Sequence, residues 1–281
     1  MRRSLPIKFS ADITGGPVRN LYLALRFALG LALLVCAPAG AAENFSIPIL
    51  VYHRFAPSVV DRMTVTISLF ESHLEYLRSS GYQIIPLRHL VEPRLSGKPA
   101  LPSRAVVITA DDGHRSVYEH LGGIARKYKL PVTLFVYPSA ISNAEYALTW
   151  GQLAELRETG LFDIQSHSYW HPNFAQEKQR LTRREYEKLV NSQLEKSKAT
   201  LETRLRSKVD MLAWPFGIYD DELIAQAIAA GYIAGFTIEG RHTTPRDPMM
   251  ALPRYLVTQT YQRKLFVDII EGRAGPPVKG Y

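Results

Sequence analysis

Ala105-Val106-Val107-Ile108-Thr109-Ala110-Asp111-Asp112-Gly113-His114 is the stretch of sequence that decides the fold. Apolar and β-branched residues fill its first positions, which predicts a buried strand of an α/β protein rather than a half-exposed one. The strand stops at two adjacent carboxylates and a glycine. In parallel α/β folds ligands collect outside the carboxyl ends of the strands, so Asp111 and Asp112 are candidate site residues. Taken alone, Asp-Asp-Gly is as typical of a plain turn.

Helical and strand patterns alternate along the rest of the chain. We expect further strands over 46–55, 83–85, 132–136, 162–167, 209–214, 234–238 and 255–257. We expect helices over 68–80, 117–128, 149–158, 182–206, 221–230 and 261–270, and a surface loop over 93–102. Ser68 with Glu71, and Thr149 with Gln152, predict capping boxes. The alternation predicts one α/β domain, a barrel-like sheet of mostly parallel strands with helices outside.

Residues 1–42 differ from the rest of the chain. A basic leader precedes an apolar run from Phe27 to Cys36, which is followed by small residues up to Ala42. This order predicts a secretory signal peptide with a long basic region, cleaved near Ala42. The run is shorter than the ~20 residues that a membrane span needs, although an uncleaved anchor is the alternative. Residues 43–281 then form the mature domain, periplasmic or secreted, without an integral membrane span.

Composition narrows the class of protein. The leader holds five basic residues and one acidic residue, so the formal charge of +8 falls to +4 in residues 43–281. This mild surplus, without a zinc-finger or RNP pattern, does not favour nucleic-acid binding. Cys36 is the only cysteine and leaves with the leader, so no disulfide supports the mature domain. The sequence leaves the oligomeric state open.

Polar residues follow several of the predicted strands. His53, Asp111 with Asp112, His167 with His171, and Arg254 all stand at or near strand ends. In a barrel these ends share one face, so the residues are candidates for a single site. Pro172 disfavours helical geometry at His171, which predicts a loop for this histidine pair.

Two imidazoles and a carboxylate form a ligand set that suits Zn²⁺, although it also holds Co²⁺, Ni²⁺ or Fe²⁺. Three protein ligands leave one position open for water, as in catalytic rather than structural zinc sites. Of the two adjacent aspartates, one can bind the metal and the other can take a proton from the water. The sequence therefore predicts metal-assisted hydrolysis of an amide or ester.

Three motifs resemble those of the polysaccharide deacetylases, the NodB-homology domains of the fourth carbohydrate-esterase family. They are Thr109-Ala110-Asp111-Asp112-Gly113, His167-Ser168-x-x-His171-Pro172 and Trp214-Pro215-Phe216-Gly217. The resemblance runs from about residue 47 to 258. It implies a distorted (β/α) barrel that removes N-acetyl groups from an amino-sugar polysaccharide.

The resemblance also implies roles for individual residues. Asp111 is the expected general base, and Asp112, His167 and His171 are the expected metal ligands. The backbone N–H of Phe216 is expected to stabilise the oxyanion, so that Trp214, Pro215 and Phe216 form the substrate-binding segment. The aromatic rings of Tyr169, Trp170 and Trp214 are candidates for stacking on sugars, with packing beneath loops as the alternative.

The chain departs from the family pattern at two places. Ala213 stands where many members carry an arginine, and we expect Arg254 to orient the base carboxylate instead, an ion pair of purely structural role being the alternative. The late Leu-x-His motif that supplies the general acid is missing. Ile49-Leu-Val-Tyr-His53 is similar to the corresponding segment of the biofilm poly-N-acetylglucosamine deacetylases, so His53 is the expected acid and His242 a weaker alternative.

The sequence leaves two other functions open. One is a carbohydrate-binding protein that has kept this fold but lost catalysis, and the other is a metallohydrolase that removes O-acetyl esters. The polymer is also open: poly-β-1,6-N-acetylglucosamine, peptidoglycan, chitin-like oligomers and other exopolysaccharides fit the motifs.

Overall fold

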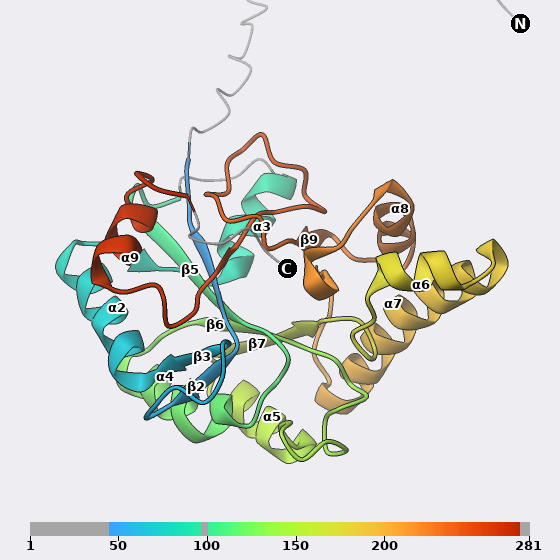
Figure 1. Cartoon of the computed structure of the whole chain (residues 1–281), viewed down its shortest axis with the longest axis horizontal. Coiled ribbons are helices and arrows are strands. Elements are labelled where there is room, and N and C mark those ends of the chain that lie inside the picture. The colour runs from blue at the N-terminus through green and yellow to red at the C-terminus, as the bar shows by residue number, and fades with distance from the viewer. Residues whose placement is uncertain (1–44, 97–100, 276–281) are drawn as a thin grey trace, which may run out of the picture. The chain divides into compact units, whose positions relative to one another are not determined.

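The computed structural model describes residues 45–96 and 101–275 (Figure 1). These residues belong to one compact unit, Glu43–Tyr281. The predicted signal peptide, residues 1–42, lies outside the described residues, as does the middle of the predicted surface loop, residues 97–100. Within the described ranges no helix has the length and apolar character needed to cross a membrane.

A parallel sheet forms the centre of the domain. Its strands are β1 (Ile49–Tyr52), β4 (Gln83–Ile84), β5 (Ala105–Ala110), β6 (Val132–Val136), β7 (Phe162–Ser166), β8 (Met211–Ala213), β9 (Ala234–Phe236) and β10 (Tyr255–Leu256). They follow the order β10-β1-β5-β6-β7-β8-β9, with β4 beside β5. Two short strands, β2 (Arg54–Ala56) and β3 (Thr64–Thr66), pair separately.

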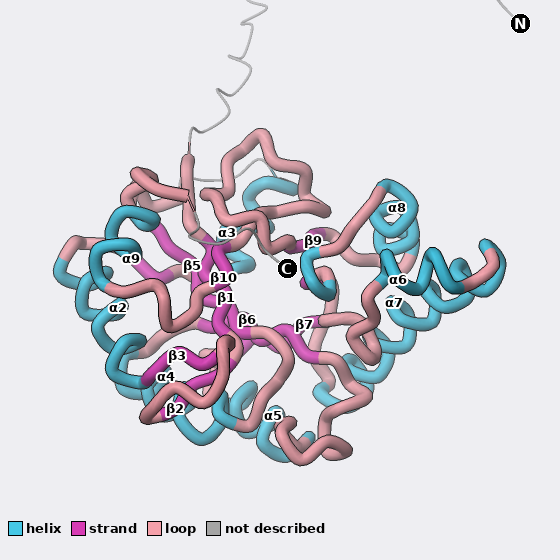
Figure 2. The backbone as a smooth tube through the Cα atoms, viewed as in Figure 1, coloured by secondary structure: helices cyan, strands magenta, loops and turns pink. Residues whose placement is uncertain are grey.

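Helices surround the curled sheet (Figure 2). They are α2 (Ile67–Ser79), α3 (Leu87–Ser96), η1 (Val117–Leu121), α4 (Gly122–Tyr128), α5 (Trp150–Glu158), α6 (Phe174–Arg180), α7 (Arg183–Leu205), η2 (Pro215–Gly217), α8 (Asp221–Ala229) and α9 (Arg263–Ile270). Because helices cover its outer face, the sheet needs apolar residues on both faces, and every residue of β1, β5, β6, β8 and β9 is buried.

The chain around Arg254 joins the two edges of the sheet. Leu252 forms a parallel bridge with Phe236 of β9, and Tyr255 of β10 pairs with Leu50 of β1. This segment therefore contacts both edge strands and completes the curl. The predicted distorted (β/α) barrel of about seven parallel strands with outer helices, in a single domain, is confirmed.

Alternating residues of each strand face two different hydrophobic layers. Val107, Phe135 and Ala213 belong to an inner cluster enclosed by the sheet. Their neighbours along the strands, such as Val106 and Leu212, belong to the outer cluster beneath the helices. Successive side chains of a strand point to opposite faces of the sheet. Whether a residue stands at an odd or even position along the strand (its parity) therefore also decides if a residue just beyond the strand end reaches the barrel interior.

The starts of two helices test the predicted capping boxes. Thr149 and Gln152 form both reciprocal hydrogen bonds at the start of α5, which confirms one box. The box at Ser68 and Glu71 is wrong, because the cap of α2 is Thr66, whose side chain accepts from the N–H of Leu69. Thr66 ends β3 with an extended backbone, so the cap lies two residues earlier than the pattern predicts.

Two helices are missing from the sequence prediction. Helix α6 occupies a stretch that we left unassigned, and α3 extends through Pro93 into the predicted surface loop. Leu87, Leu90 and Val91 of α3 are buried and pack in the inner cluster. This packing outweighs the cost of a proline in the second half of a helix.

Candidate metal centre

The predicted site residues meet at the carboxyl ends of the strands. His53 follows β1, Asp111 and Asp112 follow β5, and His167 follows β7. These four side chains, with His171 and Phe216 among others, line a pocket of about 120 Å³. A larger surface groove of about 580 Å³ lies beside α2 and is lined by other residues, so volume alone does not identify the site.

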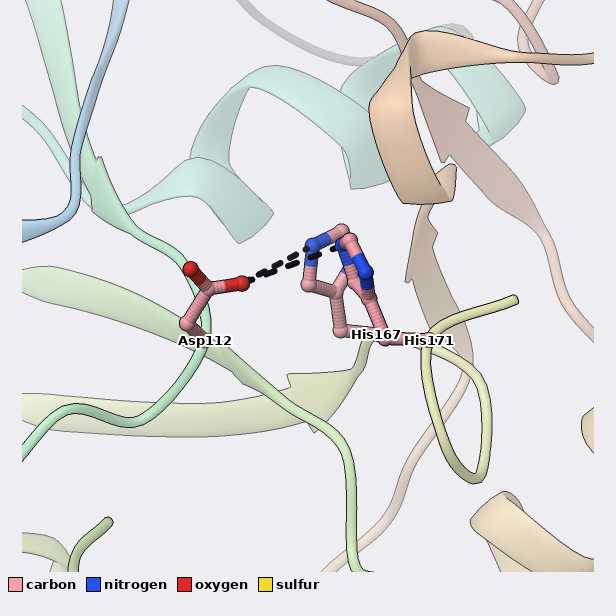
Figure 3. Close-up of side chains that lie close together, drawn as sticks. All are labelled: Asp112, His167 and His171. Atoms are coloured by element: carbon pink, nitrogen blue, oxygen red, sulfur yellow. Dashed lines mark ion pairs between the residues drawn. The ribbon is translucent and has the colours of Figure 1, made fainter. Parts of the chain in front are cut away.

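Asp112, His167 and His171 point toward a common point (Figure 3). Oδ1 of Asp112 lies 3.6 Å from Nε2 of His167 and 3.8 Å from Nε2 of His171. One ligand atom from each of the three residues lies within 4.8 Å of the others. Ligands at 2.0–2.2 Å from a tetrahedral ion are separated by about 3.3–3.6 Å, so the three ligand atoms must move inward to reach zinc geometry. The donor set fits a divalent ion with an open position.

The electrostatics of the two histidines also suit metal binding. Nδ1 of His167 lies 2.8 Å from the carbonyl oxygen of Ala213 and donates to it, which leaves Nε2 as the free lone pair. Burial lowers the pKa of His167. Burial, followed by the neighbouring His167, lowers the pKa of His171 to about 4. Both imidazoles are therefore neutral at pH 7, as metal ligands must be.

The loop that carries the histidine pair has an unusual backbone. Ser168 and His171 have φ angles of 63° and 62°, and Asp112 and Phe216 at the same site have 72° and 57°. A positive φ is uncommon for residues other than glycine and costs on the order of 1–3 kcal/mol. His171 is thus in a loop, as Pro172 predicts, and not on a helix. The surrounding structure must hold these four residues in place.

Gln193 of α7 is one of the residues that hold this loop, and the sequence analysis missed it. Its side chain is buried, and its Oε1 accepts from the N–H groups of Tyr169 (3.1 Å) and Trp170 (2.9 Å). The two residues whose N–H groups it binds lie between His167 and His171 in the sequence. The signal in the sequence is a polar residue within the buried stripe of an amphipathic helix, between Val190 and Leu194.

Asp111 is paired with Arg254 in the barrel interior. Nη1 and Nη2 of Arg254 donate to the two carboxylate oxygens at 2.8 and 2.7 Å, and both side chains are buried. Arg254 also donates to the carbonyl of Thr237 and to the hydroxyl of Thr109. Burial alone raises the pKa of Asp111, but Arg254, with smaller contributions from His167 and His53, more than offsets it, so the pKa is lowered and the carboxylate stays ionised.

His53 is half-buried at the edge of the same pocket. Its Nδ1 is buried without a hydrogen-bond partner among the described residues. A buried polar atom in this state indicates a site for a polar group of a ligand or for water. His242 instead contacts Ser46 and the carbonyl of Ile269, and it is not among the residues that line the pocket.

The structure decides between the two alternatives for the ring of Trp214, stacking on a sugar or packing. This ring is packed, because it is fully buried and its Nε1–H donates to the carbonyl of Met250. Trp214 shares the parity of Leu212 and therefore packs in the outer layer. Pro215 is buried as well. Phe216 is 39% exposed, and its ring lies 4.6 Å from that of His171.

Part of the chain, including most of the site residues, matches a known protein family. Residues 98–235 match the family model described as polysaccharide deacetylase. This range includes both aspartates and both histidines of the site but neither His53 nor Arg254. The chain is 24% identical over 212 residues to the poly-beta-1,6-N-acetyl-D-glucosamine N-deacetylase of Staphylococcus aureus strain MRSA252, covering 74% of this chain and 72% of that protein.

Two solved structures have a similar fold. IcaB from Ammonifex degensii superposes with a TM-score of 0.71 at 25% identity, over 82% of this chain and 98% of that chain. The Streptococcus pyogenes deacetylase PplD, solved in complex with acetate, gives a TM-score of 0.71 at 21% identity, over 81% of this chain and 99% of that chain. The second likeness supports the fold alone.

Proposed function

Since the chain belongs to the polysaccharide deacetylase family, we propose that it removes N-acetyl groups from an N-acetylglucosamine polysaccharide by metal-dependent hydrolysis. One observation carries this proposal. An open His/His/Asp ligand set lies beside a second carboxylate, Asp111, which is buried and yet kept ionised by Arg254. A binding protein has no need for an ionised carboxylate that is not itself a ligand.

Asp112, His167 and His171 hold the metal ion in this proposal. When bound, a divalent ion with an open position polarises a carbonyl oxygen and makes a bound water more acidic. Zinc fits two neutral imidazoles and one carboxylate best, with cobalt, nickel and iron as alternatives. The Ala213 carbonyl, which accepts from Nδ1 of His167, orients this ring so that Nε2 faces the ion.

Asp111 acts as the general base that takes a proton from the attacking water. Its Oδ2 lies 3.8 Å from Nε2 of His167, so it borders the ligand set without completing it. Arg254 holds both oxygens of this carboxylate and fixes its direction. A base must be within hydrogen-bond reach of the proton that it removes, and Asp111 lies beside the ligand set in the same pocket.

His53 acts as the general acid that protonates the leaving nitrogen of the sugar. It lines the pocket from the end of β1, and its buried, unpartnered nitrogen supports this role. The backbone N–H of Phe216 stabilises the negative charge that develops on the acetyl oxygen. A His53→Ala variant that keeps both its metal and full activity contradicts the assignment of the acid.

The site of action proposed for the protein is outside the cytoplasm. The predicted signal peptide supports export of residues 43–281, and the polymer named for the staphylococcal relatives supports an N-acetylglucosamine exopolysaccharide as substrate. Mass spectrometry of the mature N-terminus tests the expected cleavage near Ala42.

Acetate release tests the proposed activity. The purified protein is incubated with poly-β-1,6-N-acetylglucosamine, peptidoglycan, chitin oligomers and an O-acetylated glycan, each with and without a chelator. Acetate release from the first polymer, lost with chelator, is the expected result. Metal binding without acetate release from any glycan favours the inactive binding protein, and release from the O-acetylated glycan alone favours the esterase.

A further inference from the structure

Exposed aromatic side chains gather around the metal centre. Among the described residues, the aromatic side chains exposed by more than a third are Tyr146 (41%), Trp170 (41%) and Phe216 (39%). All three lie in loops that follow the carboxyl ends of strands: Tyr146 follows β6, Trp170 follows β7 and Phe216 follows β8. Exposed aromatic rings are costly to leave in water, and their confinement to one end of the barrel suggests contact with a ligand.

Ring contacts connect Tyr146 and Phe216 through a metal ligand. The His171 ring lies 4.6 Å from that of Phe216 and 5.4 Å from that of Tyr137. The hydroxyl of Tyr137 is 2.6 Å from the hydroxyl of Tyr146, and the Tyr146 ring stacks on His114. We call the four residues Phe216, His171, Tyr137 and Tyr146 the aromatic track.

The sheet order places the two exposed ends of the track on different sides of the histidine ligands. β7, which precedes His167 and His171, lies between β6 and β8. Tyr146 belongs to the β6 side and Phe216 to the β8 side. A linear ligand that contacts both rings therefore spans the loop after β7, which carries the histidine ligands.

The loop that carries Tyr146 is fixed to the site. The carbonyl of Tyr146 accepts from the N–H of Arg115, and Ala147 forms an antiparallel bridge with His114. Leu148 donates to the carbonyl of Gly113, and Ser139 donates to the carbonyl of Tyr169 in the histidine loop. A ring held in this way loses little conformational entropy when it binds a ligand.

We propose that Tyr146 and Phe216 are stacking positions for two sugar rings of the polymer, one on each side of the acetylated sugar at the metal. Each sugar places an apolar ring face on an aromatic ring and leaves its hydroxyls in water. This inference rests on the proposed function and extends it, because it makes the protein an enzyme that prefers internal sugars of a chain. Tyr146 and Tyr137 are binding residues that the motifs do not mark.

Chain-length dependence tests the proposal. We measure kcat and KM of the metal-loaded protein on β-1,6-linked N-acetylglucosamine oligomers from the dimer to the pentamer. For the unmodified protein, kcat/KM is expected to rise with length. Tyr146→Ala lowers kcat/KM for the pentamer by about tenfold, mainly through KM, since it removes binding remote from the reacting amide. Tyr146→Phe keeps the ring and should therefore keep most of the rise of kcat/KM with oligomer length.

Tyr128→Ala is the matched control. Tyr128 lies before β6, at the other end of the strand that Tyr137 follows, and lines the groove beside α2. This variant should keep the full dependence on chain length. Thermal melting checks that each variant is folded.

Binding of the pentamer to the Asp111→Asn variant, measured by calorimetry, separates this proposal from the proposed function. Addition of Tyr146→Ala to this variant should weaken binding about tenfold, even if the protein releases no acetate. If Tyr146→Ala leaves the pentamer affinity unchanged, or leaves the dependence of kcat/KM on oligomer length unchanged, the proposed role of the aromatic track is wrong. Absence of acetate release from every oligomer overturns the proposed function instead.

Discussion

Arg254 donates hydrogen bonds of 2.8 and 2.7 Å to the two carboxylate oxygens of Asp111, a residue 143 positions earlier in the chain. Both side chains are buried in the barrel interior. Arg254 lies in the segment that joins β9 to β1, so the closure of the barrel and the orientation of Asp111 depend on the same few residues. A guanidinium is suited to this place because it matches the two carboxylate oxygens with two parallel donors.

Arg254→Lys tests the importance of this pair for catalysis. Lysine keeps the charge but not the two parallel donors, so Asp111 loses its fixed direction. We expect kcat to fall by about 100-fold, the typical cost of misplacing a catalytic group, while one metal ion remains bound. Steady-state kinetics and metal analysis check this. Arg104→Lys, at a more exposed pair with Glu271, is the control. Full kcat in Arg254→Lys contradicts the role of the pair.

Removal of a metal ligand gives a different pattern. Asp112→Ala and His171→Ala each leave only two donors, so we expect zinc binding and acetate release to be lost together. Calorimetry with Zn²⁺ measures the binding, and circular dichroism checks the fold. His89→Ala, an exposed histidine on α3, is the control and should bind one ion as before. Tight binding of one ion by either ligand variant shows that the ion is held elsewhere.

Gln193 should affect the affinity for zinc, although it is not itself a metal ligand. Gln193→Met keeps the size of the side chain but removes the acceptor for Tyr169 and Trp170. We expect zinc affinity to fall by about 10- to 100-fold, as for other residues that orient ligands. Gln193→Glu keeps an acceptor and should restore most of the affinity. Equal affinity in Gln193→Met and the unmodified protein contradicts a positioning role.

The pH dependence of stability should reflect His73. This histidine is buried, its ring stacks on Phe266 at 3.7 Å, and burial lowers its pKa from 6.5 to about 4. The imidazole of His73 binds a proton more readily in the unfolded chain. The contribution of His73 to stability is therefore complete above pH 6.5 and is lost as the pH falls toward 4. The loss is about 3 kcal/mol.

Urea unfolding between pH 7 and pH 4 measures this effect. His73→Leu should remove that part of the pH dependence, whereas the control His89→Gln should retain it. If His73→Leu loses stability with falling pH as steeply as the unmodified protein, the buried imidazole is not the source.

Short-range patterns in the sequence predict the fold, and they pick out residues that the fold brings together at one site. The apolar run of β5 and the Asp-Asp that follows it locate one side of the site, and Pro172 disfavours a helix at His171. These features succeed because strand ends of a parallel barrel share one face. Arg254 can be suggested from its place near a late strand, but its direct contact with Asp111 depends on the closure of the barrel.

The errors have physical causes as well. For Trp214 both sugar stacking and packing were open, and strand parity places its ring in the outer core. Thr66, and not Ser68, caps α2 because β3 ends there. Gln193 and Tyr146 lie far in sequence from every motif, and only the packing of α7 and of the loop after β6 brings them to the site. Such long-range contacts leave little trace in local composition.

A metal titration tests the central claim most directly. Protein freed of metal by a chelator and then dialysed is titrated with Zn²⁺, and acetate release from poly-β-1,6-N-acetylglucosamine is recorded at each step. We predict no release at first, a linear rise, and a plateau at one ion per chain. Full acetate release before any metal is added, or none at one equivalent of zinc and of cobalt, contradicts metal-dependent N-deacetylation at Asp112, His167 and His171.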